Sequence, residues 1–409
     1  MSEFLRLLPV SVVPDRGAPH APYFAALERE LRERGPGKPI LLLDRDALDR
    51  NLATVRRRTA FGVALRVVAK SLPSVPLLRH VLEGLATNRL MVFDESVTEL
   101  SAFFPEADIL LGKPLPERAI DRFYEQHGSA GGERVQWLVD DGARLARLQA
   151  QARRLGVRLR VSLEVDVGLH RGGFASPDAL SSALSSIAAD PAHLRFAGLM
   201  GYDAHVAAAP PLLSSPERAH RVSVERYAAF ARAVRDHDIT WAANATFNGG
   251  GSKTYALHRA DGPVGEVALG SALVMPTDFD VPTLASHQPA LFLAAPVLKR
   301  LEGTRIPYLD RLSAAWSRID PNRQVTYFLF GGGWMAKPFS PEGLIRNPLY
   351  GTSTNQSLLN GSRRTALEPE SSVFFRPTQS ERVMQELGSL HLVRGGKLAG
   401  TWEVLPFTP

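Results

Sequence analysis

The sequence of 409 residues contains no cysteine. Disulfide bonds, thiolate metal ligands and a cysteine nucleophile are therefore excluded, although this absence does not fix the cellular compartment. No apolar run approaches the roughly 18 residues that a membrane-spanning helix needs. The first residues, MSEFLRLLP, include an early acidic residue and only a short apolar stretch, which is not the pattern of a secretory signal. We therefore expect a cytoplasmic protein that does not bind membranes.

Acidic residues are slightly outnumbered by basic ones, which gives a formal net charge of +6. A basic balance can indicate nucleic-acid binding. Here the arginines are spread over segments with helical periodicity, and no basic stripe is interleaved with aromatic residues. They fit the solvated surface of an ordinary globular protein, for which 44% hydrophobic and 22% charged residues are also typical. We expect no nucleic-acid partner.

Short apolar runs alternate with amphipathic segments over the first two thirds of the chain. The runs are typical of strands buried on both faces, and they lie at 40–43, 65–69, 89–93, 109–111, 135–139, 158–165, 195–201 and 241–247. Helical patterns lie between most of them, at 75–83, 96–104, 116–126, 141–155, 176–189 and 216–236. About eight strand–helix units predict a (β/α)8 barrel. A doubly wound open sheet is the alternative, because alternation alone does not close a barrel.

Beyond Pro276 this alternation stops. The later segments read as strands with turns and few helices between them, at 290–298, 324–330, 372–375 and 390–393. We therefore expect a lead-in at 1–38 that packs with the C-terminal domain, an α/β barrel at 39–280, and a mostly-β domain at 281–409. A long loop at 338–363, rich in Pro, Gly, Ser and Asn, is expected to border a site.

A lysine stands where the second predicted strand ends, in the stretch LRVVAKSLP at 65–73. If Lys70 lies against an apolar wall, its amine is a usable nucleophile toward an aldehyde. The alternative is an ordinary lysine that reaches water from a strand end.

Three more polar clusters follow predicted strands: EVDVGLHRGG at 164–173, GYDAH at 201–205 and NGGGSKTY at 248–255. Function collects at the carboxyl ends of the strands in a barrel. His170 and His205 could therefore serve as general bases or metal ligands. The alternative is that they are structural histidines that form hydrogen bonds at a polar rim.

The glycine run of the third cluster suits phosphate binding. Gly249, Gly250, Gly251 and Ser252 form a backbone that a phosphate can approach closely, although such a run is also common in plain loops. Its place near the last barrel strands favours the phosphate site. A lysine at an early strand and a phosphate loop at a late one together match the layout for pyridoxal phosphate in a barrel.

Together these stretches resemble the D-threonine aldolase and D-serine dehydratase family, which has the alanine-racemase-like fold type of pyridoxal-phosphate enzymes. The likeness runs from about Pro39 to the C-terminus. It rests on 39–51, the segment ending at Lys70, EVDVGLHRGG at 164–173, GLMGYDAH at 198–205, NGGGSKTY at 248–255 and GEVALGSALVMPTDFD at 265–280. The resemblance implies a (β/α)8 barrel, a C-terminal β domain, and a homodimer with its sites near the subunit interface.

The resemblance also implies roles for single residues. Lys70 takes the place of the lysine that forms the Schiff base with pyridoxal 5'-phosphate, and residues 249–252 take the place of the phosphate loop. His170 and Arg171 match the family's histidine–arginine pair beside the cofactor. Tyr202 matches the tyrosine close to the cofactor ring.

The chain departs from the family pattern at two places. Ser71 follows the lysine directly, and Leu72 and Pro73 come next, where the family commonly has a further polar residue, often histidine. Many members also bind a divalent metal through a His-x-Cys pair in the C-terminal domain. The corresponding stretch here is FFRPT at 374–378, and His391 has no partner at suitable spacing. The metal polarises the substrate's 3-hydroxyl in those members, and we expect this chain to lack that metal site.

The resemblance implies a lyase that acts on a small D-amino acid with a 3-hydroxyl. In an aldolase, His170 or His205 would take the 3-hydroxyl proton while the Cα–Cβ bond breaks. In a dehydratase, Lys70 would take the Cα proton. A racemase of the same fold and a non-catalytic pyridoxal-phosphate-binding protein are alternatives. A hydrolase that uses only a metal fits less well, because the carboxylates and histidines show no tight ligand spacing.

Overall fold

The computed structural model describes residues 13–208, 214–304, 319–350 and 353–406. The chain divides into two compact units. The sheet unit comprises residues 1–48, 275–278 and 289–404, and the barrel unit comprises 49–274, 279–288 and 405–409. Within the described ranges, no helix is both long enough and apolar enough to cross a membrane.

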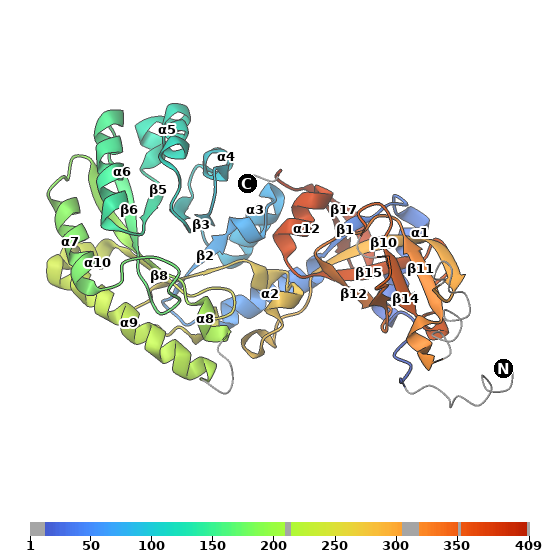
Figure 1. Ribbon diagram of the computed structural model, residues 1–409. Helices are drawn as coiled ribbons and strands as arrows, with labels where there is room; N and C mark the ends of the chain where they lie inside the picture. The colour runs from blue at the N-terminus through green and yellow to red at the C-terminus, as the bar shows by residue number, and fades with distance from the viewer. Residues whose placement is uncertain (1–12, 209–213, 305–318, 351–352, 407–409) are drawn as a thin grey trace. The chain divides into compact units, whose positions relative to one another are not determined.

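Eight parallel strands close into a barrel in the barrel unit (Figure 1). They are β2 Ala64–Val68, β3 Arg89–Val92, β4 Asp108–Leu111, β5 Val135–Val139, β6 Leu159–Glu164, β7 Leu194–Gly201, β8 Thr246–Gly249 and β9 Glu266–Leu269. Each strand pairs with the next, and β9 pairs in parallel with β2 to close the ring. The barrel prediction is confirmed, and the open sheet is excluded.

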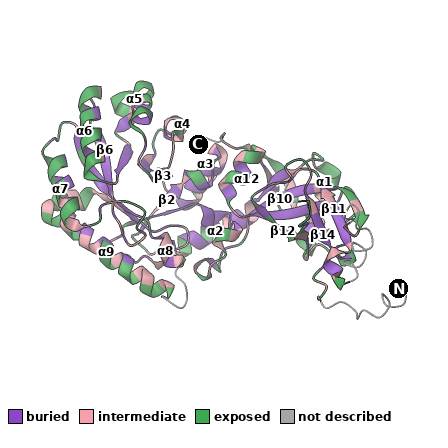
Figure 2. Cartoon of the chain, viewed as in Figure 1, coloured by how far each residue is buried: buried purple, intermediate pink, exposed green. Residues whose placement is uncertain are grey.

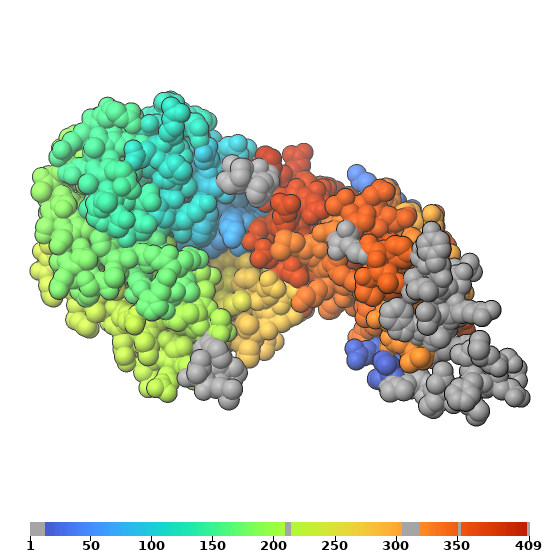
Figure 3. Space-filling model, viewed as in Figure 1, coloured from blue at the N-terminus to red at the C-terminus, as the bar shows by residue number. Residues whose placement is uncertain are grey.

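Amphipathic helices cover the outside of these strands, and their inner faces are buried (Figure 2). They include α2 Arg45–Arg58, α3 Val75–Leu85, α4 Ser96–Phe103, α5 Glu117–Gly132, α6 Gly142–Leu155, α7 Pro177–Ala188 and α9 Pro216–His237. The side chains of Asp141, Ser176 and Ser215 accept backbone N–H bonds and so cap α6, α7 and α9. In the space-filling view, the segments coloured teal to yellow-green, which include α5, α6, α7 and α9, make up much of the visible surface of the barrel unit (Figure 3).

One predicted barrel strand lies in the other unit, and one predicted strand is mostly helical. The run at 40–43 is β1 Ile40–Asp44, which belongs to the sheet unit, and the eighth barrel strand is β9. Burial of β1 on both faces produces the same apolar run as a barrel strand, so the pattern alone could not separate them. Most of 241–247 is also helical: α10 spans Ile239–Asn244, capped by Asp238.

The sheet unit is mostly β, as expected. Its main strand order is β13-β14-β11-β10-β1-β16-β17, and β15 pairs with both β10 and β12. The bounds are β10 Leu291–Glu302, β11 Val325–Leu329, β12 Ala336–Ser340, β13 Ile345–Arg346, β14 Leu358–Gly361, β15 Ser372–Pro377, β16 Ser389–Arg394 and β17 Lys397–Glu403. The segment predicted as a loop at 338–363 therefore contains strand residues, and its residues 351–352 lie outside the described residues.

Two helices accompany this sheet, α1 Pro22–Arg34 and α12 Ser380–Leu387. Helix α1 buries Phe24, Leu27 and Leu31 in one cluster with β1 and with Phe292 and Phe374. These apolar side chains recur at helical spacing, which turns one face of α1 toward the sheet. The lead-in thus contributes to the core of the sheet unit.

The barrel interior holds charged side chains. Arg66 on β2 is fully buried, with its Nε 2.6 Å from Glu266 Oε1 and its Nη2 2.6 Å from Asp108 Oδ2. Gln136 on β5 donates to Asp108, and Asn248 on β8 donates to Glu266. A buried charge is costly unless it is paired and hydrogen-bonded. This network meets that condition, and Asn248 connects it to the start of the glycine loop.

Candidate functional site

Lys70 lies just beyond the carboxyl end of β2, in a single turn of 3-10 helix at Ala69–Ser71. Its neighbours Ala69 and Ser71 are buried, whereas the Lys70 side chain is exposed and its ammonium lies 5.9 Å from the centroid of the Phe93 ring. Of the two alternatives for Lys70, the structure shows the lysine that reaches water from a strand end. The amine projects from a backbone that its buried neighbours hold in place.

The glycine loop follows β8 and leaves no room for larger residues. Gly250 has φ +67°, a conformation that favours glycine. A Cβ on Gly251 would lie 2.8 Å from Cε2 of Tyr202. The Ser252 hydroxyl accepts hydrogen bonds from the N–H groups of Gly270 and Ala272, at 3.0 and 3.2 Å. The loop is thus fixed at its Ser252 end by the segment after β9.

The segment 270–272 also touches the lysine turn. Ser271 Oγ donates to Ser71 Oγ at 3.0 Å, and a Cβ on Gly270 would lie 2.8 Å from the Cβ of Ser71. Strand β9 lies between β2 and β8, and neighbouring strands are about 4.8 Å apart, so the ends of β2 and β8 are roughly 10 Å apart. The structure therefore brings Lys70 and the glycine loop to the same end of the barrel.

Two further predicted residues lie beside the loop. The guanidinium carbon of Arg171 is 5.0 Å from the centroid of the Tyr202 ring, and that ring contacts the space next to Gly251. A cation over an aromatic face is attracted by the ring quadrupole. Arg171 and Tyr202 thus form one wall beside the glycine run.

The two predicted histidines differ in their surroundings. His170 is 67% exposed and donates from Nδ1 to Asp166 Oδ2 at 2.6 Å, so its Nε2 is the nitrogen left to accept a proton. His205 is half-buried, and a Cβ on Gly168 would lie 3.1 Å from its Nε2. Burial is the main cause that lowers the pKa of His205, while the carboxylate of Asp203 opposes it. Burial of His205 therefore favours its neutral form.

The sequence motifs did not indicate that the pKa of one carboxyl group is raised. Glu164 ends β6, and burial raises the pKa of its side chain, with Asp140 and Asp166 adding to the effect and Arg171 opposing it. A raised pKa favours a carboxyl group that can donate a proton. The sequence shows a glutamate at the end of a strand, and this position alone does not indicate a shift of its pKa.

The position expected for the family's metal ligands carries an arginine. Arg376 on β15 is buried, and its Nε donates to the backbone carbonyl of Met275 at 2.9 Å within the sheet unit. A second contact joins its Nη2 to the carbonyl of Pro276 at 3.4 Å. A guanidinium is a donor only and cannot bind a cation.

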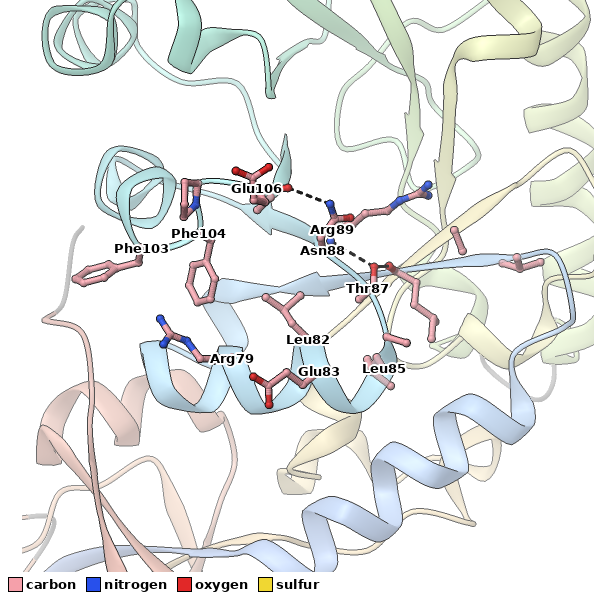
Figure 4. Close-up of a pocket in the computed structure, with 16 residues that line it drawn as sticks. Arg79, Leu82, Glu83, Leu85, Thr87, Asn88, Arg89, Phe103, Phe104 and Glu106 are labelled. Atoms are coloured by element: carbon pink, nitrogen blue, oxygen red, sulfur yellow. Dashed lines mark hydrogen bonds between the residues drawn. The ribbon is translucent and has the colours of Figure 1, made fainter.

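One cleft of the barrel unit lies away from this cluster of residues. It is lined by Leu82 and Leu85 of α3, by Thr87 and Asn88 before β3, and by Phe104 (Figure 4). These residues gather at the amino ends of β2 and β3, opposite the end that carries Lys70. Chemistry in (β/α)8 barrels collects at the carboxyl ends of the strands, and the amino ends serve stability. We therefore place the candidate site at the carboxyl end.

The sequence pattern of the family described as alanine racemase, N-terminal domain, matches residues 43–278, more than half of the chain. The chain belongs to this family. A 3-hydroxy-D-aspartate aldolase of Paracoccus denitrificans is 29% identical over 245 residues, which are 59% of this chain and 61% of the relative. The chain thus matches about three fifths of the length of that relative. The resemblance stated from the motifs is confirmed.

Two solved structures share the fold of this chain. The D-threonine aldolase of Filomicrobium marinum superposes with a TM-score of 0.68 at 20% identity, covering 89% of this chain and 94% of that one. The D-threo-3-hydroxyaspartate dehydratase of Delftia sp. HT23 has a TM-score of 0.66 at 18% identity, covering 90% and 98%. At these identities the likeness establishes the alanine-racemase-like architecture.

Proposed function

We propose that this chain is a pyridoxal-phosphate-dependent lyase that acts on a small D-amino acid with a 3-hydroxyl group. Lys70 would hold the cofactor covalently, and residues 249–252 would bind its phosphate. The observation that carries this proposal is the shared contact of the lysine turn and of Ser252 with the segment 270–272. That contact is consistent with a cofactor that reaches both groups at once.

The residues present fit this cofactor. A Cβ on Gly249 would lie 2.9 Å from Val264 Cγ2, and Gly251 is equally confined by Tyr202, so the run offers bare backbone. Bare backbone N–H groups in a turn are suited to a phosphate. The exposed amine of Lys70 has the access that covalent attachment needs. When bound, pyridoxal phosphate serves as an electron sink for charge that develops at Cα of an amino acid.

His170 is the base that the geometry favours for an aldolase. Asp166 holds its Nδ1–H, which orients the ring and leaves Nε2 to take the 3-hydroxyl proton. As the Cα–Cβ bond breaks, the hydroxyl carbon becomes a carbonyl and the electron pair goes to Cα. His205, whose burial favours its neutral form, is a second candidate for this proton. In a dehydratase, the Lys70 amine would take the Cα proton, and Glu164 is suited to protonate the departing hydroxide.

The substrate class follows from the names of the relatives. The aldolase of Paracoccus denitrificans and a D-threonine aldolase of Arthrobacter sp, 29% identical over 180 residues, are both named for D-amino acids that carry a 3-hydroxyl. We therefore propose that D-threonine and 3-hydroxy-D-aspartate are the first substrates to test. We also propose a homodimer, as the family resemblance implies, which sedimentation equilibrium would check.

Attachment of the cofactor is tested first. Borohydride reduction of the purified protein with pyridoxal phosphate should label the peptide that contains Lys70, and Lys70→Ala should abolish the label and the visible absorbance. Lys113→Ala is the matched control, because Lys113 is an exposed lysine that follows β4 at the same end of the barrel. Labelling of another lysine, or equal labelling in Lys70→Ala, would contradict the proposal.

The reaction is tested with D-threonine. Glycine and acetaldehyde indicate an aldolase, and 2-oxobutanoate indicates a dehydratase. Uptake of solvent deuterium at Cα with inversion would instead indicate a racemase. A bound cofactor whose absorbance no amino acid alters would indicate a binding protein without turnover, and the lyase proposal would then be abandoned.

A further inference from the structure

Three potential metal ligands converge behind the glycine loop. Asp203 follows β7, His220 lies near the start of α9, and His258 follows the 3-10 turn Tyr255–Leu257. Asp203 Oδ2 is 3.4 Å from His258 Nε2 and 4.0 Å from His220 Nδ1. All three ligand atoms lie within 4.8 Å of one another. Three separate elements of the barrel unit therefore direct nitrogen and oxygen lone pairs to one point.

These atoms are buried and, among the described residues, have no hydrogen-bond partner. Asp203 is 2% exposed and His258 is 5% exposed. Among the described residues, none forms a hydrogen bond with Asp203 Oδ2, His220 Nδ1 or His258 Nε2. Buried polar atoms in proteins nearly always have a hydrogen-bond partner. Three such atoms without one at a single point therefore need an explanation. The other oxygen of Asp203 accepts a hydrogen bond from Thr254 Oγ1 at 2.7 Å, which fixes the orientation of the carboxylate.

We propose that Asp203, His220 and His258 bind one divalent transition-metal ion, with zinc(II) as the best match. Two imidazole nitrogens and a carboxylate oxygen, with a water in the fourth position, are a common zinc ligand set. At bond lengths of about 2.1 Å, tetrahedral ligands lie roughly 3.4 Å apart. The separations of Asp203 Oδ2 from the two histidine nitrogens, 3.4 and 4.0 Å, lie near this value. Magnesium and calcium prefer oxygen ligands and fit this set poorly.

The competing explanation is an ion pair without metal. A protonated His258 could pair with Asp203 across 3.4 Å, but this pairing leaves His220 Nδ1 buried and unsatisfied. Two imidazole rings that face the same carboxylate oxygen, with centroids 4.7 Å apart, would also repel each other if both were charged. A metal ion satisfies all three atoms at once.

The site supports the glycine loop. Thr254 Oγ1, which donates to Asp203, also accepts the N–H of Gly251 at 2.9 Å. A Cβ on Gly250 would lie 2.6 Å from His258 Nε2. The metal would therefore fix the loop from the side of His258. This proposal does not depend on the bound cofactor or on turnover.

Metal content is the direct test. Metal is removed from the full chain with a chelator, and the chain is then dialysed against zinc. Its zinc content is measured by elemental mass spectrometry. We expect one zinc per chain, and His220→Gln should weaken zinc binding at least tenfold. His237→Gln, the same substitution in the last turn of the same helix, is the matched control and should bind zinc as the unchanged protein does.

Cobalt(II) gives a second readout that needs no variant. A four-coordinate site with nitrogen and oxygen ligands should give visible d–d absorption when cobalt is added to the stripped protein, and zinc should displace it. Zinc should also raise the melting temperature of the unchanged protein but not that of folded His220→Gln. Absence of bound zinc and of the cobalt absorption would overturn the proposal, as would equal zinc binding by His220→Gln. Failure of Lys70 to carry a cofactor would leave these results unchanged.

Discussion

Replacement of Arg66 by methionine should destabilise the barrel unit by about 3 kcal/mol. Arg66 is fully buried, and its guanidinium forms ion pairs with Glu266 and Asp108. It also donates from Nη1 to the backbone carbonyls of Leu90 and Asp108, at 2.9 and 2.7 Å. Methionine fills similar space but supplies none of these donors.

The expected loss of stability depends on which partners Glu266 and Asp108 keep after Arg66 is replaced. Removing one partner of a buried pair costs about 3–5 kcal/mol, because it leaves an uncompensated charge. Here Glu266 keeps Arg89 and Asn248, and Asp108 keeps Arg160 and Gln136. Two carboxylates would then face two arginines. This residual balance places the expected cost at the lower end of the range.

Arg89→Met is the matched control. Arg89 binds the same Glu266 at 2.8 Å, but its side chain is 41% exposed, so its loss should cost less than about 1 kcal/mol. The two units need not unfold together. Hydrogen exchange of peptides from β2 and β4 in increasing urea therefore reports the barrel unit alone. Equal costs for the two variants, or an Arg66→Met cost below 1 kcal/mol, would refute the reasoning about burial.

Two other predictions concern the barrel unit. Burial, assisted by the charge of Arg58, lowers the pKa of His287 from 6.5 to about 4. As the pH falls below 6.5 the unfolded chain takes up this proton first. The free energy of unfolding is therefore not reduced by His287 above pH 6.5, and it declines by at most about 3 kcal/mol toward pH 4. Urea unfolding should show a weaker decline in His287→Gln, and parallel curves would contradict this. Gly251→Ala should weaken pyridoxal-phosphate binding about tenfold or more, because the Cβ meets Tyr202 at 2.8 Å. Gly265→Ala, which has open space around its Cβ, should leave the affinity measured by absorbance titration unchanged.

Local patterns predicted most of the barrel, because each helix and strand of a (β/α)8 unit has its own periodicity. The pattern of apolar runs did not predict β9. Glu266 opens this short strand, and its charge is compatible with a buried position because Arg66 of β2, Arg89 of β3 and Asn248 of β8 all bind it. These contacts join distant parts of the chain, so a window of neighbouring residues could not detect them.

In the candidate site, too, some features are visible in the local sequence and others depend on distant contacts. Lys70 and the glycine run are visible as local motifs, and the structure brings both to one end of the barrel. The exposure of Lys70 and the proximity of Asp203, His220 and His258 depend on contacts between elements far apart in sequence. Ligand spacing along the chain indicates a metal site only when the ligands share a local element.

The conformation of the glycine loop depends mainly on residues outside the glycine run. Consecutive glycines lose more conformational entropy on ordering than any other residues, so a glycine loop is costly to fix. Tyr227 of α9 donates to the carbonyl of Asn248, and Glu266 accepts from the Asn248 side chain. Ser252 is held by the backbone after β9, and Thr254 is held by Asp203. These bonds come from β9, α9 and the segment after β7. Substitutions in those elements should therefore weaken phosphate binding even though none of them would contact the phosphate.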